Sequence, residues 1–180
     1  MHRILLLCAL IAITGNAWSN CPEFLNHDFR KLHSKESIQL CDLATNNVLL
    51  LVNTASHCGF TPQFKDLEAI HQRYRDKGLV VIGFPSNDFD QAASSEEKAH
   101  QICHVNYGVS FTMVAPSSVR GNHANPVFAE LARQSHAPSW NFSKYLVDRD
   151  GRVVKMFGSN ISPQDDILTT ALEHLLHTDE

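Results

Sequence analysis

Cys58 is the residue of this 180-residue chain whose type and position most clearly permit chemistry. It follows an apolar run that begins at Val48, and it lies three residues before Thr61, which with Pro62 predicts the N-cap and first turn of a helix. Unpaired N–H groups and the dipole at a helix start stabilise an anion. We therefore expect a thiolate, a nucleophile that can attack a peroxide oxygen. Local context alone leaves an inert, buried thiol as the alternative.

Three segments carry signatures that occur in a fixed order along the chain. They are Asn53–Gln63 (NTASHCGFTPQ), Gly83–Phe89 (GFPSNDF), and Trp140–Phe142 (WNF) followed by Lys144–Gly151 (KYLVDRDG). Together they resemble the glutathione peroxidase family, and the resemblance covers nearly all of the chain after its first thirty residues or so.

The resemblance implies a non-selenium, cysteine-containing peroxidase of the exported, bacterial type, which needs no cofactor. Such an enzyme is expected to reduce hydrogen peroxide and organic or lipid hydroperoxides through a cysteine sulfenic acid, in the response to oxidative stress. Its reductant is expected to be glutathione or a thioredoxin-like protein. Carried over by position, Cys58 is the peroxidatic residue, Trp140 offers an indole N–H and Asn141 an amide N–H. The alternatives are a core aromatic for Trp140 and a turn residue for Asn141.

Asp88 departs from the family pattern, because it stands where the family usually has a glutamine of the site, and Ser86 stands at a nearby cysteine position. An ionised carboxylate beside the sulfur would disfavour a thiolate. We therefore expect Asp88 to point away, to be held by other donors, or to act when protonated. The alternative is a loop residue that caps backbone N–H groups. The loop from Asp90 to Ser94 is also shorter than in many members of the family.

The remaining cysteines suggest one structural disulfide and one redox partner. Cys21 and Cys41 flank a short N-terminal segment, and we expect them to form a structural disulfide, although four cysteines allow three pairings. Cys103 lies in a predicted helix, which resembles the location of the resolving cysteine in non-selenium members. A sulfenic acid on Cys58 would condense with Cys103 to a disulfide. A buried structural thiol is the alternative for Cys103.

Two other functions fit parts of the sequence. A thioredoxin-like disulfide oxidoreductase would normally show Cys-x-x-Cys, whereas here the residue three after Cys58 is Thr61. A metal-binding chaperone of the same fold is suggested by 11 histidines and the pair His57–Cys58. These histidines lack a compact zinc spacing, although His100 and His104 lie one helical turn apart, so we expect no metal site.

The N-terminus has the layout of a cleavable secretory leader. A basic start at His2-Arg3 precedes an apolar run of about ten residues and small residues at Ala17 and Ser19, which predicts a signal peptide over residues 1–19. The run is too short for a transmembrane anchor. Residues 20–180 are then a single domain, exported to the periplasm or secreted.

A net charge of −4 without basic clusters argues against nucleic-acid binding. The stretch from Gln134 to Trp140 is short where tetrameric, selenium-containing members of the family that the chain resembles carry a long insertion, so the resemblance implies a monomer.

Apolar runs and helix signals alternate along the chain and predict an α/β domain of the thioredoxin-like fold, with a central mixed β-sheet flanked by helices. The predicted strands are 48–52 and 79–84, and the predicted hairpin spans 145–157 and turns at Asp150-Gly151. Four helices are predicted, beginning with Thr61-Pro62, with a capping box of Ser94 and Glu97, with Asn125-Pro126, and with Ser162-Pro163.

Overall fold

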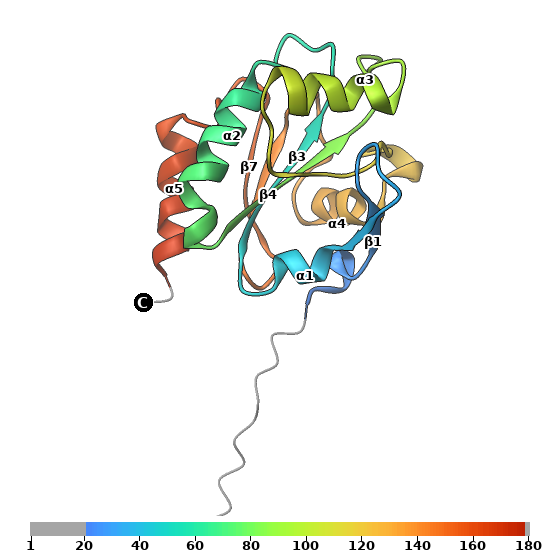
Figure 1. Cartoon of the computed structure of the whole chain (residues 1–180). Helices are drawn as coiled ribbons and strands as arrows, with labels where there is room; N and C mark the ends of the chain where they lie inside the picture. Colours follow the sequence, from blue (N-terminus) through green and yellow to red (C-terminus); the bar gives the residue numbers. More distant parts are fainter. Residues whose placement is uncertain (1–20, 179–180) are drawn as a thin grey trace, which may run out of the picture.

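The apolar run after Asn47 forms the central strand, β3 (Val48–Thr54), of a five-stranded sheet in the computed structural model, which describes residues 21–178. The sheet order is β5-β4-β3-β6-β7 (Figure 1). β4 is parallel to β3 and β5, whereas β6 is antiparallel to β3 and β7, so the sheet is mixed as predicted. The other strands of this sheet are β4 (Leu79–Pro85), β5 (Thr112–Met113), β6 (Lys144–Val147) and β7 (Val153–Phe157).

Helices cover both faces of this sheet, and a two-stranded ribbon, β1 (Asp28–Arg30) with β2 (Ser37–Gln39), lies beside it. The α-helices are α1 (Leu40–Ala44), α2 (Gln63–Tyr74), α3 (Glu96–His100), α4 (Pro126–Gln134) and α5 (Asp166–His177). The short 3-10 helices are η1 (Glu23–Leu25), η2 (Arg75–Lys77) and η4 (Gly121–His123), and α3 continues into the π-helical segment η3 (Gln101–Asn106).

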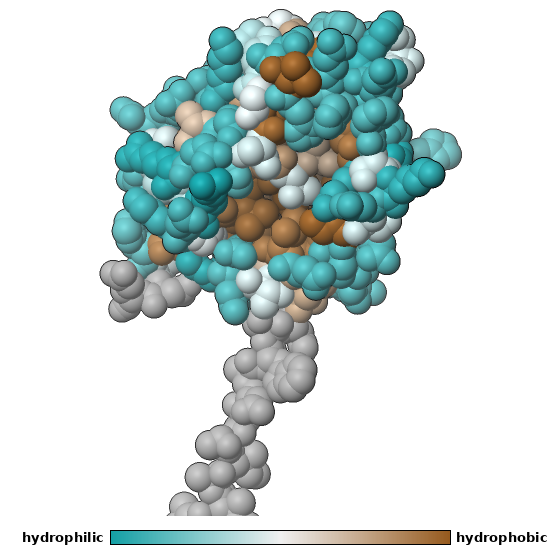
Figure 2. All heavy atoms as spheres, in the orientation of Figure 1, coloured by the Kyte–Doolittle hydropathy of each residue, from teal (hydrophilic) through white to brown (hydrophobic). Residues whose placement is uncertain are grey.

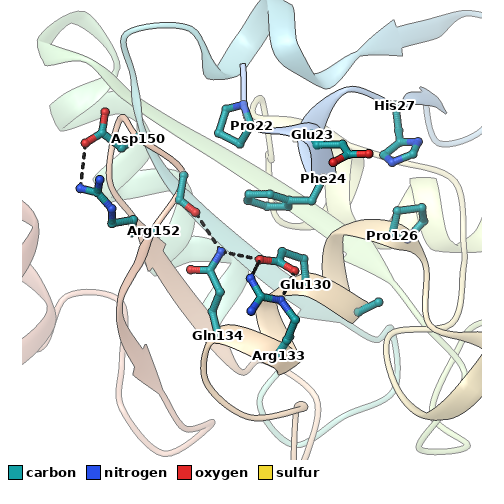
Figure 3. Close-up of a pocket in the computed structure, with 12 residues that line it drawn as sticks. Pro22, Glu23, Phe24, His27, Pro126, Glu130, Arg133, Gln134, Asp150 and Arg152 are labelled. Atoms are coloured by element: carbon teal, nitrogen blue, oxygen red, sulfur yellow. Dashed lines mark hydrogen bonds and ion pairs between the residues drawn. The ribbon is translucent and has the colours of Figure 1, made fainter. Parts of the chain in front are cut away.

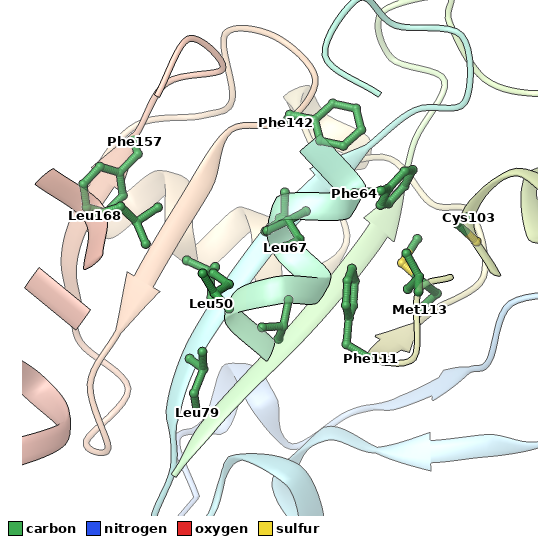
Figure 4. Close-up of a cluster of buried hydrophobic side chains, with 14 of the residues drawn as sticks. Leu50, Phe64, Leu67, Leu79, Cys103, Phe111, Met113, Phe142, Phe157 and Leu168 are labelled. Carbon is green, nitrogen blue, oxygen red and sulfur yellow. The ribbon is translucent and has the colours of Figure 1, made fainter. Parts of the chain in front are cut away.

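All seven residues of β3 are buried, because alternate side chains of the strand enter two separate apolar clusters. Leu50 lies in the cluster beneath α2 and α5, together with Leu67 and Leu168 (Figure 4). Leu49 lies in the cluster on the other face, which α4 and the N-terminal segment cover. In the view of Figure 1 the outer surface is largely hydrophilic, and apolar side chains show mainly in a hollow between α2 and β1 (Figure 2).

The predicted helices exist, but three of them begin later than the sequence suggested. Ser95, not Ser94, is the N-cap of α3, and its hydroxyl accepts the Lys98 N–H at 3.2 Å. The N-cap of α2 is Pro62 rather than Thr61, and that of α5 is Asp165 rather than Ser162. Asn125 caps α4 as predicted, since its side chain accepts the Phe128 N–H at 3.0 Å.

The predicted disulfide between Cys21 and Cys41 is present and joins the residues before η1 to α1, with a Cα–Cα distance of 5.6 Å. It fixes the N-terminal segment over the α4 side of the sheet. The predicted signal peptide, residues 1–19, lies outside the described residues. Between residues 21 and 178, no helix is both long and apolar enough to cross a membrane.

Candidate active site

Cys58 lies in a tight loop between β3 and α2 that a threonine hydroxyl closes. The Cys58 N–H donates to Thr61 Oγ1 at 3.0 Å, and the same hydroxyl donates to the Ala55 carbonyl at 3.1 Å. Because the hydroxyl is engaged in this way, Thr61 does not cap α2. The Phe60 N–H donates to Cys58 Sγ at 3.4 Å, and the residue is 6 % exposed. The sulfur therefore already acts as a hydrogen-bond acceptor, which is the role that a thiolate takes.

Gln91 joins the segment that carries Cys58 to the segment that carries Asn141. The carbonyl of Gln91 accepts the His57 N–H at 2.9 Å, and its side-chain Oε1 accepts from Asn141 Nδ2 at 3.0 Å. Asn141 is fully buried, and its Oδ1 has no hydrogen-bond partner within the described part of the chain. The structure thus adds a glutamine to the site that sequence reasoning did not single out. The sequence offered one signal for Gln91, the short loop from Asp90 to Ser94. Where a loop has lost residues, matching this chain to the family by position is unreliable.

Asn53, near the end of β3, fixes the turn that carries the third signature. Its carbonyl accepts the Phe142 N–H at 2.7 Å, and its side-chain Oδ1 accepts the Ser143 N–H at 3.0 Å. Asn53 Nδ2 also donates to the Trp140 carbonyl at 3.2 Å. Phe142 adopts a φ of 61°, a left-handed conformation that is strained for a bulky residue and is typical of functional sites.

Trp140 lies at the protein surface rather than in the core. Its side chain is 41 % exposed, and its ring packs against Phe89 with a centroid distance of 5.2 Å. The core-aromatic alternative for Trp140 is therefore wrong, and the indole is open to solutes that approach this face.

Asp88 is held by other donors, which is one of the arrangements that the sequence allowed, and its catalytic role stays a prediction. Its carboxylate accepts from the Val119 N–H at 2.6 Å and from the hydroxyls of Ser118 and Ser86, each at 2.9 Å. Burial alone would raise the pKa of Asp88, but these hydrogen bonds outweigh it and lower the pKa, so the carboxylate is ionised at neutral pH. Asp88 anchors the 118–119 segment, and Gln91 is the residue that contacts the Asn141 amide.

Cys103 lies in the π-helical segment η3 and belongs to the same apolar cluster as Cys58 (Figure 4). The thiol is 2 % exposed, and Sγ lies 3.6 Å from the His100 carbonyl, to which it donates. Burial raises the pKa of Cys103 to about 11, so the side chain is a protonated thiol at rest. Both thiols are free. The resolving role of Cys103 stays a prediction.

The cavities of the structure differ in their distance from Cys58. A hollow of about 720 Å³ lies between η1, α4 and the β6–β7 turn, at the end of β3 remote from Cys58 (Figure 3). Its charged side chains pair with one another, Arg133 with Glu130 and Arg152 with Asp150. A second hollow of about 420 Å³ is lined by residues 54–56, 85–87 and 92–96, and thus borders the loop that carries Cys58.

The histidines that suggested a metal site do not form one in the structure. The rings of His100 and His104 are tilted by 44° with centroids 4.5 Å apart, and the ring centroid of His33 lies 5.4 Å from that of His100. Among residues 21–178, no group of three His, Cys, Asp or Glu side chains is arranged to hold a metal ion.

Comparison with known proteins gives concordant results. The sequence model of the family described as "Glutathione peroxidase" matches residues 25–132. A glutathione peroxidase of Lactococcus lactis is 39% identical over 136 residues, which cover 72% of this chain and 86% of the relative. A glutathione peroxidase-like peroxiredoxin of Schizosaccharomyces pombe is 44% identical over 123 residues, 65% of this chain and 78% of the relative.

A solved structure supports the fold. The crystal structure of T. cruzi GPX1 superposes with a TM-score of 0.67 at 22% identity and covers 87% of this chain and 98% of that one. The chain therefore has the thioredoxin-like α/β fold that the sequence predicted.

Proposed function

Since this chain belongs to the glutathione peroxidase family and is a thiol peroxidase, we propose that it reduces hydrogen peroxide and organic or lipid hydroperoxides with Cys58 as the nucleophile. We assign a sulfenic acid on Cys58 as the intermediate and oxidative stress as the setting in which the enzyme acts. The observation that carries the proposal is a buried sulfur that accepts an N–H, in a loop that Gln91 joins to Asn141.

The proposed reaction balances in two stages. The Cys58 thiolate attacks one peroxide oxygen, an S–O bond forms, the O–O bond breaks, and the departing oxygen takes a proton to give an alcohol or water. A second thiol then attacks the sulfenic sulfur, so that a disulfide forms and water leaves. Two thiols of the reductant, glutathione or a thioredoxin-like protein, finally reduce that disulfide.

The polar groups around Cys58 have the chemistry that a hydroperoxide needs. A hydroperoxide has one O–H donor, and the buried Asn141 Oδ1 is an acceptor without a partner among the described residues. Leaving such an atom unpaired costs about 1–3 kcal/mol, which a bound O–H would offset. The departing oxygen develops negative charge, for which the exposed Trp140 offers an indole N–H donor.

Cys103 is the proposed second thiol of the cycle. Its sulfur is buried and protonated at rest, so the segment that holds it must open before a Cys58–Cys103 disulfide can form. A π-helical segment supports this idea, because such segments are irregular and are frequent at functional sites.

We further propose that the protein is an exported monomer. The Cys21–Cys41 disulfide supports a periplasmic or secreted location, because such bonds persist in oxidising compartments. The short connection between α4 and Trp140 supports the monomer, since it leaves little chain for an assembly contact.

Steady-state turnover tests the proposed function. Wild type, Cys58→Ser and Cys103→Ser are each offered hydrogen peroxide and an organic hydroperoxide, with glutathione and a thioredoxin system supplied separately. We expect Cys58→Ser to lose more than about nine-tenths of the activity while it keeps its fold, because a hydroxyl does not replace a thiolate as nucleophile. Residual activity above a tenth of wild type, in a variant with an unchanged circular dichroism spectrum, contradicts the proposal.

A further inference from the structure

Lys144 is a fully buried lysine at the start of β6, in the third signature. On this strand, Tyr145 enters the cluster on the α4 side of the sheet and Leu146 enters the cluster on the α2 side. Because side chains alternate along a strand, Lys144 faces the α2 side, where Cys58 also lies. A lysine is almost never fully buried unless it is paired, so its charge calls for an explanation.

The hydrogen-bond acceptors of the Lys144 ammonium are neutral. Nζ donates to Gln63 Oε1 at 2.9 Å and to the Ile161 carbonyl at 2.5 Å. The charged group that acts on it is Asp66 of α2, whose carboxylate accepts from the side chains of Ser162 and Gln164. In the sheet, Lys144 lies between the apolar residues Val52 of β3 and Phe157 of β7.

A chain of hydrogen bonds leads from Lys144 to the candidate active site. Gln63, which Lys144 orients, donates through Nε2 to the Ser159 carbonyl at 2.6 Å, and Ser159 Oγ donates to the Asn141 carbonyl at 2.6 Å. Gln63 is also the first residue of α2, directly after the turn that supplies the Phe60 N–H to Cys58 Sγ. Lys144 is thus linked to both segments that flank the site. It contacts the first residue of α2 directly, and it reaches Asn141 through Gln63 and Ser159.

We propose that Lys144 is a positioning residue for the reaction of Cys58, which holds Gln63 and, through Ser159, also Asn141 in place, and whose buried positive charge lies on the side of the sheet that carries Cys58. The inference rests on the proposed function. In an apolar interior a charge acts over a longer distance than in water, because little solvent screens it. The same hydrogen bonds without the charge would hold the segments equally well, so the charge itself requires a role.

The titration of Lys144 makes the proposal testable. Burial lowers the pKa of Lys144 to about 8, although Asp66 acts in the opposite direction. The cation is therefore present at neutral pH and is lost as pH rises through about 8. The stabilisation that the cation gives to a thiolate should be lost over the same range, so the effect of replacing Lys144 should be largest below pH 8 and should vanish at higher pH.

The experiment measures the rate constant of Cys58 alkylation by iodoacetamide, and of its oxidation by hydrogen peroxide, from pH 5 to 10. The proteins are wild type, Lys144→Met, Gln63→Glu and, as control, Lys65→Met, which removes an exposed lysine of α2. We expect the control to match wild type at every pH. Lys144→Met should react about tenfold more slowly at pH 7, the effect of about one pH unit in thiolate formation, and should approach the wild-type rates above pH 8, where the cation is absent from wild type as well.

Gln63→Glu separates the role of the charge from a structural role and remains informative if Lys144→Met does not fold. It keeps an acceptor for Nζ but adds a carboxylate, which favours the ammonium form, so the difference from Lys144→Met should persist to higher pH than it does in wild type. An unchanged pH profile in Gln63→Glu, or a folded Lys144→Met with the wild-type rate and profile, overturns the proposal. Failure of the proposed function is distinguishable, because peroxide would then not oxidise Cys58 in wild type, whereas alkylation still reports on Lys144.

Discussion

Cys58 and Cys103 lie in one apolar cluster, but their sulfur atoms have opposite hydrogen-bonding roles. Cys58 Sγ accepts the Phe60 N–H, whereas Cys103 Sγ donates to the His100 carbonyl. An accepting sulfur suits a thiolate, and a donating sulfur must keep its proton. The two environments are therefore consistent with the proposed roles, Cys58 in the attack on the peroxide and Cys103 in the later exchange.

Gln91 and Asp88 provide a matched test of which loop side chain serves the reaction. We expect Gln91→Leu to lower kcat/KM for hydrogen peroxide by about 10- to 100-fold, because it removes the contact to Asn141, and the unpaired Asn141 amide should also cost about 1–3 kcal/mol of stability. Asp88→Asn should lower only the free energy of unfolding, by about 1–3 kcal/mol, because the carboxylate holds Val119, Ser118 and Ser86. Kinetics and urea unfolding of both variants check this expectation.

The pH dependence of the free energy of unfolding provides a second test of the role of Asp88. The pKa of Asp88 is lowered in the folded protein, so the stabilisation is present above the ordinary aspartate pKa and is lost as pH falls through the folded value. The difference in unfolding free energy between wild type and Asp88→Asn should therefore shrink in acid. A large loss of activity in Asp88→Asn without loss of stability would instead show that Asp88 serves the reaction.

At the site, the sequence predicted the residues that lie in well-matched segments. Cys58 and Asn141 are in segments whose length matches the signatures, and the structure places both in one hydrogen-bonded region. Gln91 could not be predicted, because its position depends on how a shortened loop folds back onto His57. Which of the three expected arrangements Asp88 adopts could not be predicted for the same reason.

The helix that carries Cys103 is irregular where the proposed chemistry needs movement. α3 begins with a regular cap at Ser95, but from Gln101 the chain continues as a π-helix. The extra residue per turn weakens the backbone hydrogen bonding, so this segment is a good candidate for local opening.

Cys103→Ser tests whether this opening serves the reaction. With one equivalent of hydroperoxide, wild type should form a Cys58–Cys103 disulfide, whereas the variant should retain a sulfenic acid that dimedone traps. Thioredoxin-supported turnover of the variant should fall sharply, and any glutathione-supported turnover should survive. If the variant matches wild type with both reductants and yields no dimedone adduct, Cys103 is a packed thiol and the cycle uses one cysteine.

Element types followed from the sequence more reliably than element boundaries. The apolar run of β3 and the Asn125-Pro126 start of α4 predicted their elements correctly, because local signals decide them. The N-cap of α2 was predicted at Thr61, because a threonine before a proline is typical of the start of a helix. Tertiary structure overrode that signal, since the Thr61 hydroxyl holds the Cys58 loop instead.

At the scale of the whole molecule, the Cys21–Cys41 disulfide and the site lie at opposite ends of the sheet. The disulfide ties the N-terminal segment to α1, next to the hollow of Figure 3, whereas Cys58 follows the other end of β3. The two should therefore act independently, one on stability and the other on chemistry.

Replacing both cysteines by serine should leave the peroxidase reaction intact but destabilise the protein. The bond closes a loop with a sequence separation of 20, for which the chain-entropy estimate is about 3 kcal/mol. Thermal unfolding of the double variant checks this value, and turnover at a temperature well below its Tm checks the independence. Equal Tm values for the variant and wild type would contradict the stabilising role.

The central claim is that a hydroperoxide oxidises Cys58, and a single turnover without reductant tests it most directly. Reduced protein is mixed with one equivalent of hydrogen peroxide, quenched within seconds in the presence of dimedone, digested and mapped by mass spectrometry. The account predicts that the first modification is at Cys58, as a dimedone adduct or as a disulfide to Cys103, in near-stoichiometric yield. Unmodified Cys58 with the peroxide intact, or first oxidation at another residue, would contradict it.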